Sequence, residues 1–431
     1  MGGARPSGTG VAGALSGTAH FSKSPVSEIL RAPKTPTTSR SVRGKVRDFV
    51  ELPFSPNLTC QYSMNNGRQY LIVSAILFTV LLVFIAGCTG TAPVVPGPGS
   101  AGTTPGVSST SPPDHVIFVE PIDGRAEVIK TIAGARKNIT LTIFQLDDPA
   151  IVAALAAAQE RGVSIRVLYN NASFAAANQT NPNFYAVANL TPLGIAMKPA
   201  SPAFTITHQK TLTADRSRAI IMTFNLDPAF FGGTRDFGIV TSNESEIREI
   251  AEVFEADWNY RNVSPSQPSL IWGPVNSRAK ILGLINNATR TLEVYNDEIT
   301  DPQCIDALGA AAKRGVVVRV LAANMQGTNG TNVNAPALAT LNANGAQAKT
   351  ITSLYIHAKV AVADYGTPKQ VAYVGSEYLA PVSLDHSREL AILVSEQPIL
   401  DRIESVFSQD WLVPEMPEPS VAPTGKAGPA S

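Results

Sequence analysis

The chain has 431 residues, 44% of them hydrophobic, which is enough to form the cores of two ordinary domains. Its three cysteines, Cys60, Cys88 and Cys304, are too few and too scattered for a disulfide framework or a cysteine metal site. Five histidines form no ligand cluster, so we expect chemistry without a metal or cofactor. Residues 115–411 carry 24 Lys and Arg against 28 Asp and Glu, a balance that disfavours nucleic acid as the partner.

The N-terminal region reads as an export signal. Residues 1–63 are rich in Ser, Thr, Pro and Gly, so we expect them to be disordered or a mis-assigned extension upstream of a true start at Met64. Residues 64–88 have a short segment with Arg68, a long apolar run and small residues before Cys88, as in a signal peptide. The ending Ile-Ala-Gly-Cys resembles a lipobox, which predicts lipid attachment at Cys88.

An uncleaved membrane anchor is the alternative interpretation of residues 64–88, because 18 apolar residues can just span a bilayer. Both interpretations leave the chain beyond Cys88 outside the cytoplasm and held at the membrane. Residues 89–114, rich in Pro, Gly, Ser and Thr, have the composition of an extended tether. At the other end, residues 413–431 are expected to form a flexible tail.

From about residue 115 the sequence repeats. Arg125, Leu168 and Trp258 recur as Arg278, Leu321 and Trp411, each 153 residues later, within matching stretches. A constant offset of this kind is what duplication produces. We therefore expect an α/β protein with tandem units at 115–262 and 268–412, packed about a pseudo-two-fold axis as a bilobal body that is most simply a monomer.

Each copy has the pattern of an α/β unit. A helix around 128–132 precedes a strand at 139–144, and Asp148-Pro149 should open an Ala-rich helix by capping. Further expected elements of the first copy are strands at 163–169, 204–213, 219–223 and 237–241, and a helix at 244–258.

The same short motif occurs at equivalent points of both copies. It is His-x-Lys-x4-Asp, formed by His208, Lys210 and Asp215 and by His357, Lys359 and Asp364. On a strand, residues two apart point to one face, so each His should project beside its Lys. An imidazole beside an ammonium suits a phosphodiester, because one group can attack phosphorus while the other neutralises its oxygens. The aspartates, at the strand ends, are expected to organise the site.

This paired motif resembles the phospholipase D superfamily. The family has Gly-Ser and then Asn after each motif; here copy two has Ser376 with Tyr378 in place of Asn, and copy one has Thr223 and Asn225 without Gly-Ser. The resemblance also implies a downstream carboxylate that orients the histidine, Asp236 in copy one and Glu389 in copy two. We expect each copy to supply its own. The neighbouring Arg235 and Arg388 are expected to pair with these carboxylates.

The resemblance implies a covalent phosphohistidine, with one His as nucleophile and the other as general acid. The family usually places the nucleophile in the first motif, here His208, but the symmetric sequence leaves the assignment open. We expect hydrolysis of a phospholipid head group or its transfer to another alcohol. An exported nuclease of the same superfamily is the disfavoured alternative, and a scaffold that kept only the fold is a third.

Overall fold

The computed structural model describes residues 113–170, 181–327 and 330–415, which belong to one compact unit from Pro105 to Ser431. Cys88, the segments 1–63 and 64–88, nearly all of 89–114 and most of 413–431 lie outside the described residues. Within the described ranges, no helix is both long and apolar enough to cross a bilayer.

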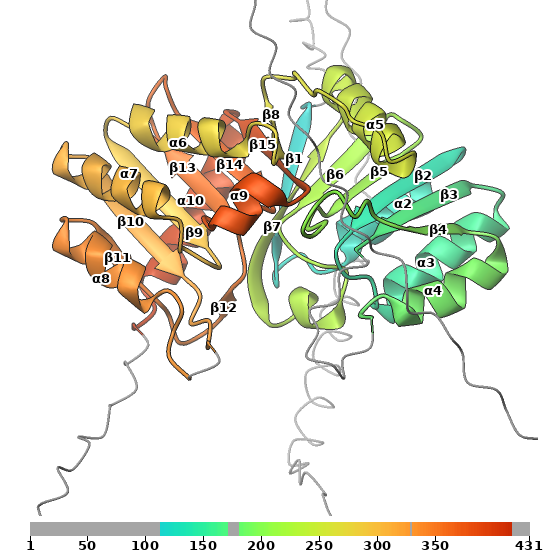
Figure 1. Cartoon of the computed structure of the whole chain (residues 1–431), viewed down its shortest axis with the longest axis horizontal. Coiled ribbons are helices and arrows are strands. Elements are labelled where there is room, and N and C mark those ends of the chain that lie inside the picture. The colour runs from blue at the N-terminus through green and yellow to red at the C-terminus, as the bar shows by residue number, and fades with distance from the viewer. Residues whose placement is uncertain (1–112, 171–180, 328–329, 416–431) are drawn as a thin grey trace, which may run out of the picture. The chain divides into compact units, whose positions relative to one another are not determined.

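The first half of the unit runs from β1 to α5 and the second from β8 to α10 (Figure 1). The first half comprises β1 (His115–Glu120), α2 (Ala126–Gly134), β2 (Asn138–Ile143), α3 (Pro149–Glu160), β3 (Ser164–Tyr169), α4 (Phe184–Leu190), η1 (Thr191–Leu193), β4 (Ala196–Pro199), β5 (Thr211–Ala214), β6 (Arg218–Met222), η2 (Pro228–Phe231), β7 (Thr234–Thr241) and α5 (Glu244–Trp258).

The second half repeats this order with small changes. It comprises β8 (Leu270–Gly273), α6 (Ser277–Asn287), β9 (Thr291–Asn296), α7 (Pro302–Lys313), β10 (Val317–Ala322), α8 (Ala335–Ala343), β11 (Gln347–Lys349), β12 (Tyr355–Ile356), β13 (Val360–Ala363), β14 (Val371–Gly375), α9 (Pro381–His386), β15 (Glu389–Val394) and α10 (Gln397–Trp411).

Local sequence signals set several of these boundaries. Asp148 caps α3 by accepting hydrogen bonds from the backbone of the first turn, and Pro149 occupies a position where a missing N–H costs nothing, as predicted. Asp301 and Pro302 begin α7 in the same way. The same device at equivalent positions shows that the duplication extends to the helix caps.

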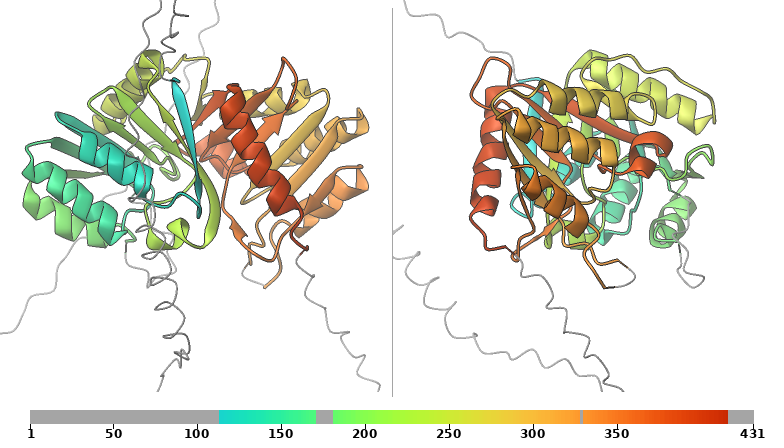
Figure 2. Two further views of the ribbon diagram at one scale, coloured as in Figure 1. Left: turned by 180° about the vertical axis from the view of Figure 1, so that it is seen from behind. Right: turned by 60° about the vertical axis from the view of Figure 1, so that its left-hand side comes forward.

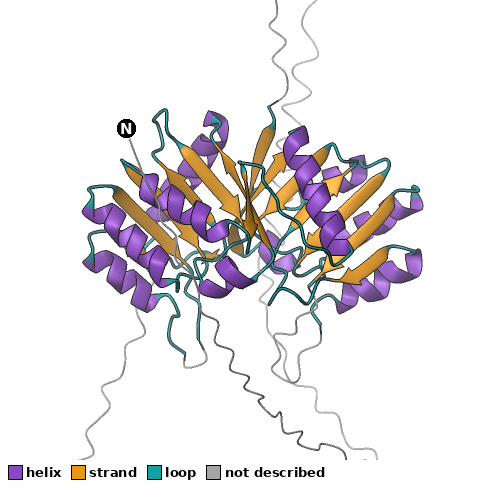
Figure 3. Cartoon of the chain, turned by 45° about the horizontal axis from the view of Figure 1, so that its top comes forward, coloured by secondary structure: helices purple, strands orange, loops and turns teal. Residues whose placement is uncertain are grey.

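The two sheets have matching strand orders. The first is β1-β7-β6-β5-β2-β3-β4 and the second, read from its other edge, is β8-β15-β14-β13-β9-β10-β11. In each sheet the strands of the β-α-β units pair in parallel, and the other neighbours within these two orders pair antiparallel. The predicted mixed α/β fold with two tandem units is therefore confirmed, and Figure 3 shows the strands converging at the centre with helices outside.

Three apolar cores hold the unit together. One lies between the first sheet and α2, α3 and α4, and an equivalent core lies between the second sheet and α6, α7 and α8. The third combines side chains of both sheets with α5 and α10, including Phe237, Trp272 and Phe407. Figure 2 shows α10 from behind, lying close to β1. Because this core draws on both halves, it fixes one half against the other.

The segment before each motif departs from the prediction. His208 and Lys210 precede β5, and His357 and Lys359 precede β13, so the histidine and lysine of each motif do not lie within its strand. The backbone N–H groups of His208 and Gln209 donate to the carbonyl of Arg388, which lies in the other half, at 2.9 and 3.0 Å. Because these N–H groups bond the other half, they are not available for pairing within the first sheet. The strand predicted at 204–213 is therefore shortened to Thr211–Ala214.

The reciprocal crossing occurs in the second half. Strand β12 pairs in parallel with β7 of the first sheet, with Ile356 opposite Arg235, and Thr207 forms the equivalent parallel bridge to Arg388. In each half, the segment at the start of the motif therefore pairs with the sheet of the other half. This exchange carries both histidines to the boundary between the sheets.

Candidate active site

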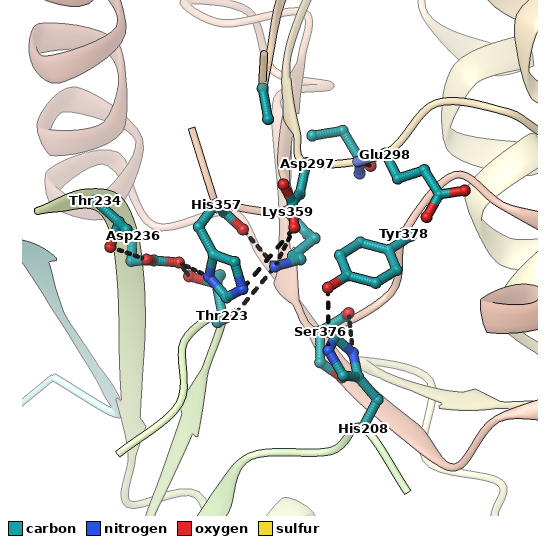
Figure 4. A network of polar contacts seen from close by, with 12 residues as sticks. His208, Thr223, Thr234, Asp236, Asp297, Glu298, His357, Lys359, Ser376 and Tyr378 are labelled. Carbon is teal, nitrogen blue, oxygen red and sulfur yellow. Dashed lines mark hydrogen bonds and ion pairs between the residues drawn. The ribbon is translucent and has the colours of Figure 1, made fainter. Parts of the chain in front are cut away.

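His208 is buried at this boundary, with 2% of its surface exposed. Its Nδ1 lies 3.1 Å from Oε2 of Glu389 and 3.2 Å from the carbonyl oxygen of Ser376, both of which can only accept a hydrogen bond. Nδ1 therefore carries the proton, and Nε2 keeps its lone pair. That lone pair faces the hydroxyl of Tyr378 at 3.2 Å, which donates to it (Figure 4).

His357 has a related but different setting. Its Nδ1 lies 2.9 Å from Oδ1 of Asp236, which fixes the same tautomer. Its Nε2 faces no hydroxyl in the described structure; the nearest charged group is Oδ2 of Asp297, at 3.9 Å. The ring of Phe230 packs against the imidazole with 4.5 Å between centroids. The two histidines thus match at Nδ1 and differ at Nε2, the nitrogen that would meet a substrate.

Burial makes both imidazoles neutral. Desolvation lowers the pKa of His208 to about 4, and the nearby Lys210 contributes in the same direction. The pKa of His357 is also lowered, again by burial, although the charges of Asp236 and Asp297 oppose the shift. Burial would raise the pKa values of Asp236 and Glu389, but the hydrogen bond from the paired histidine and the charge of the nearby lysine, Lys359 or Lys210, lower both. Each pair is therefore a neutral imidazole beside an ionised carboxylate.

The orienting carboxylates are exchanged between the halves. Glu389 of the second half contacts His208, and Asp236 of the first half contacts His357. The expectation that each copy supplies its own carboxylate is wrong, because the crossing segments carry each histidine away from its own sheet. Hydroxyl groups hold both carboxylates: Ser383 donates to Glu389 at 2.7 Å, and Thr234 donates to Asp236 at 2.5 Å.

The two lysines are buried beside the histidines. Lys210 donates to the carbonyl of His208, and Lys359 donates to the carbonyl of His357 and, at 3.4 Å, to that of Thr223. Burial lowers the pKa of both ammonium groups. Nζ of Lys359 also lies 4.7 Å from the ring centroid of Tyr378, which touches His208, so the two motifs form one site.

The residues after the motifs have separate tasks. Thr223 donates to Asp236 at 2.6 Å, and the hydroxyl of Ser376 bonds the backbone of Leu390. Asn225 is buried, and its Oδ1 accepts no hydrogen bond from the described residues. Tyr378, in place of the family's Asn, contacts His208 directly, as shown above. The Thr223 hydroxyl therefore holds a carboxylate and the Ser376 hydroxyl holds the adjacent backbone, while Tyr378 faces the reaction centre.

The two motif aspartates are not gathered with the histidines. Asp215 follows β5 and accepts hydrogen bonds from the backbone N–H groups of residues 136, 137 and 138, at 2.7–3.0 Å. Asp364 follows β13 and accepts hydrogen bonds from four donor groups of residues 289–291 at distances from 2.6 to 3.3 Å, one of these donors being the hydroxyl of Thr289. Each lies at the opposite strand end from its lysine and ties that strand to the start of the neighbouring one.

The expected pairing of Arg235 and Arg388 with the orienting carboxylates is also wrong. Arg235 donates to both oxygens of Asp410, at 2.6 and 2.9 Å, and Arg388 donates to Asp257 at 2.9 Å. Both are buried pairs that join one half to the other. The reason is alternation along a strand: an Arg next to an inward-facing carboxylate projects to the opposite face.

Sequence reasoning missed Asp297. It follows β9 at the position that the 153-residue offset matches with Phe144. Phe144 packs against His208 with centroids 4.9 Å apart, whereas Asp297 faces His357 and Lys359, at 3.9 and 3.8 Å. Applying the offset to every position near the motifs would have found this difference. The described residues contain no group of three or more His, Cys, Asp or Glu side chains arranged as metal ligands.

Comparison with known proteins gives a consistent result. The family described as "Cardiolipin synthase, PLD-like domain" matches residues 128–258 and 281–411, more than half of the chain. No curated protein matches the sequence.

Among solved structures, polyphosphate kinase from Porphyromonas gingivalis aligns with a TM-score of 0.55 at 15% identity, over 68% of this chain and 46% of that one. This chain thus spans about half of the kinase's length. Phosphatidylserine synthase from Haemophilus influenzae Rd KW20 aligns with a TM-score of 0.54 at 11% identity, over 69% of this chain and 85% of that one. At such identities the likeness is one of fold. The two family matches, together with two motifs that meet in one site, identify the chain as a member of the phospholipase D-like family.

Proposed function

We propose that this protein is a phosphodiesterase that works through a covalent phosphohistidine on His208, and that its substrate is a phospholipid. The observation that carries the proposal is the pair of neutral, buried histidines, each held at Nδ1 by a carboxylate and flanked by a lysine. With Nδ1 held by a carboxylate, Nε2 is in each case the nitrogen that can meet an incoming phosphate.

The difference between the two Nε2 atoms supports His208 as the nucleophile. Nε2 of His208 accepts a hydrogen bond from the hydroxyl of Tyr378. The pKa of about 4 keeps His208 unprotonated at neutral pH. His357 faces two carboxylates, Asp236 and Asp297, which favour its protonated form once an anionic substrate arrives. His357 is then suited to be the acid.

The reaction balances once His357, neutral in the free protein, has taken up a proton from solvent at Nε2 as the anionic substrate binds. Nε2 of His208 attacks phosphorus, the bond from phosphorus to the alcohol breaks, and the leaving oxygen takes a proton from Nε2 of His357. Water, or a second alcohol, then attacks phosphorus and gives its proton to His357, while the phosphorus–nitrogen bond breaks and restores the lone pair of His208. The two lysines offset the charge of the phosphate oxygens.

A lipid substrate and a location at the membrane complete the assignment. They are supported by the acidic balance of residues 115–411 and by the apolar run before Cys88. We propose that the protein is held at the outer surface of the cell membrane, through a lipid on Cys88 or through an uncleaved anchor.

One experiment separates the roles of the histidines. A p-nitrophenyl phosphodiester has a leaving group that needs no proton, so His357→Ala should release one equivalent of p-nitrophenol per protein and then stall as phosphohistidine. His208→Ala should give neither release nor adduct. Intact mass after an alkaline quench detects the adduct. An adduct in His208→Ala would contradict the assignment of the nucleophile.

The substrate class is tested with the native protein in EDTA. Phospholipid vesicles and single-stranded DNA are offered separately, and head-group release is compared with strand cleavage. Release of head groups without cleavage of DNA is the expected result, whereas cleavage of DNA alone would replace the lipid assignment with a nuclease.

A further inference from the structure

Two long stretches of the body carry no charged side chain. Residues 167–197 and 320–348 contain no Lys, Arg, Asp or Glu, although residues 115–411 as a whole carry 24 Lys and Arg and 28 Asp and Glu. The stretches are equivalent in the repeat, since each begins after an arginine of β3 or β10 and ends before a lysine of β4 or β11. A helix that covers a sheet usually has charged residues on its outer face, so an outer face without charge is uncommon.

The described part of the first stretch exposes large apolar side chains. Helix α4 packs Ala186 and Leu190 into the first core, while Phe184 and Tyr185, on its other side, are 68% and 42% exposed. The turn η1 that follows adds Leu193, which is 44% exposed. We call Phe184, Tyr185 and Leu193 the α4 patch. The equivalent helix α8 exposes only small or neutral side chains, those of Pro336, Ala339, Thr340, Asn342 and Ala343.

Both uncharged helices begin beside the active site. Helix α4 follows Asn183, whose Nδ2 donates to the carbonyl of Phe144 at 3.0 Å, and Phe144 packs against His208. Helix α8 follows Asn334, whose Nδ2 donates to the carbonyl of Asp297 at 2.8 Å in the same way. In Figure 1, α4 and α8 lie on opposite sides of the lower part of the view, with β12 between them. Since β12 leads directly into the second motif, the two helices flank the site.

An uncharged face with exposed aromatic side chains matches the surface of a phospholipid bilayer. Aromatic rings prefer the zone between head groups and acyl chains, which accommodates both an apolar body and a polar edge. A charged side chain pressed into that zone would lose its water, which costs free energy. The lack of charge in both stretches removes this cost.

A second copy of this chain fits the patch less well. A specific dimer buries about 800 Å² on each partner, whereas α4 has 7 residues and is only about 10 Å long. Docking on a membrane needs less area, because the proposed anchor at 64–88 is joined to the body by residues 89–114, which span at most about 90 Å. A body held that close to a bilayer meets it at high local concentration.

We infer that the α4 patch inserts into the head-group region of a phospholipid bilayer, with the uncharged face of α8 against the same surface, and so holds the active site at the lipid. This rests on the proposed function and adds the surface through which that site reaches its substrate. Because the face has no charge, docking should not require anionic lipids and should persist at high salt.

The first test uses the full chain and offers substrate in two physical forms, phosphatidylcholine vesicles and a soluble p-nitrophenyl phosphodiester. The double variant Phe184→Ser with Tyr185→Ser should lower kcat/KM on vesicles by about tenfold and leave the soluble diester within about twofold of the native value. Val317→Ser is the matched control, because Val317 is 52% exposed but begins β10, at the strand end away from α8. It should change neither rate.

The second test locates the patch directly and is independent of the anchor, because it reports the depth of one side chain. Phe184→Trp adds an emission that brominated phosphatidylcholine should quench, with or without phosphatidylglycerol and also at high salt. The emission added by Val317→Trp should stay unquenched.

Three results would overturn the inference. The first is no quenching with Phe184→Trp, or quenching only with anionic lipid. The second is an equal loss of both activities in the double variant, which would make α4 a structural support. The third is a double variant that dissociates a dimer in sedimentation while its rate on vesicles is unchanged. If the native protein hydrolyses neither substrate, the proposed function fails, and the quenching result still decides whether the patch docks.

Discussion

Nε2 of His208 and Nε2 of His357 are the atoms at which the two copies differ most. The first faces a tyrosine hydroxyl and the second a carboxylate, although both imidazoles are buried and held at Nδ1. A small number of substitutions, Tyr378 for the family's Asn and Asp297 opposite Phe144, thus turns a symmetric pair into two groups with separate tasks. In the proposed mechanism, charge and hydrogen bonding at one nitrogen decide which histidine attacks and which donates a proton.

The lowered pKa of His208 predicts that activity declines only at low pH. Attack needs the unprotonated Nε2, and the pKa of this group in the free protein is about 4 instead of the usual 6.5. We expect kcat/KM to persist as the pH falls through 6.5 and to decline only near pH 4, because kcat/KM reports ionisations of the free enzyme. Initial rates with a p-nitrophenyl phosphodiester provide the measurement, and circular dichroism at each pH excludes unfolding as the cause. A limb at pH 6.5 would mean that His208 is solvated or is not the attacking group.

Strands β5 and β13 illustrate how one element serves both the site and the fold. Each begins directly after the motif lysine and ends directly before the motif aspartate. Asp215 and Asp364 have φ of +55°, a left-handed conformation that Asp tolerates better than most residues. Their carboxylates bond the start of the neighbouring strand. The four residues between the motif Lys and Asp are therefore the whole of β5 or β13.

This role predicts a loss of stability without a loss of chemistry. Asp364→Ala removes four acceptor contacts and places alanine at positive φ, so the free energy of unfolding should fall by about 2–4 kcal/mol. Asp364→Asn retains one acceptor oxygen and should fall less. Urea unfolding gives both values, and kcat per folded molecule should stay within about twofold. A large fall in kcat with unchanged stability would place Asp364 in the reaction instead.

At the scale of the whole molecule, the two halves depend on each other. The central core combines both sheets, each histidine takes its carboxylate from the other half, and Arg235–Asp410 and Arg388–Asp257 cross the same boundary. His115 bonds Glu246 of α5 at 2.9 Å and also Glu396, next to α10. Burial would lower its pKa, but these two carboxylates raise it to about 9, so it is charged at neutral pH.

The crossing ion pairs predict unequal costs for removing an arginine. Arg235→Met leaves the buried Asp410 without its bidentate partner, so stability should fall by about 3–5 kcal/mol. Arg402→Met breaks an ion pair that is more than one-third exposed on both sides and should cost less than about 1 kcal/mol. Urea unfolding midpoints of the two variants make the comparison. Equal midpoints would show that the buried pair does not hold the halves together.

The sequence by itself determined the repeat, the α/β class, the capped helices and the chemistry-bearing His and Lys, because these depend on local patterns and on an offset that can be counted. It did not determine partners. The partners lie 121 to 181 residues apart in the pairs Glu389 with His208, Asp236 with His357 and Arg235 with Asp410. Because the two copies are equivalent in sequence, a partner in the same copy is as plausible as one in the other copy. Only the tertiary structure decided between them, because backbone hydrogen bonds at Arg388 and Arg235 draw each motif onto the other sheet. The same packing brought Asp297 and Tyr378 to the two Nε2 atoms and so separated two histidines that the sequence had left equal.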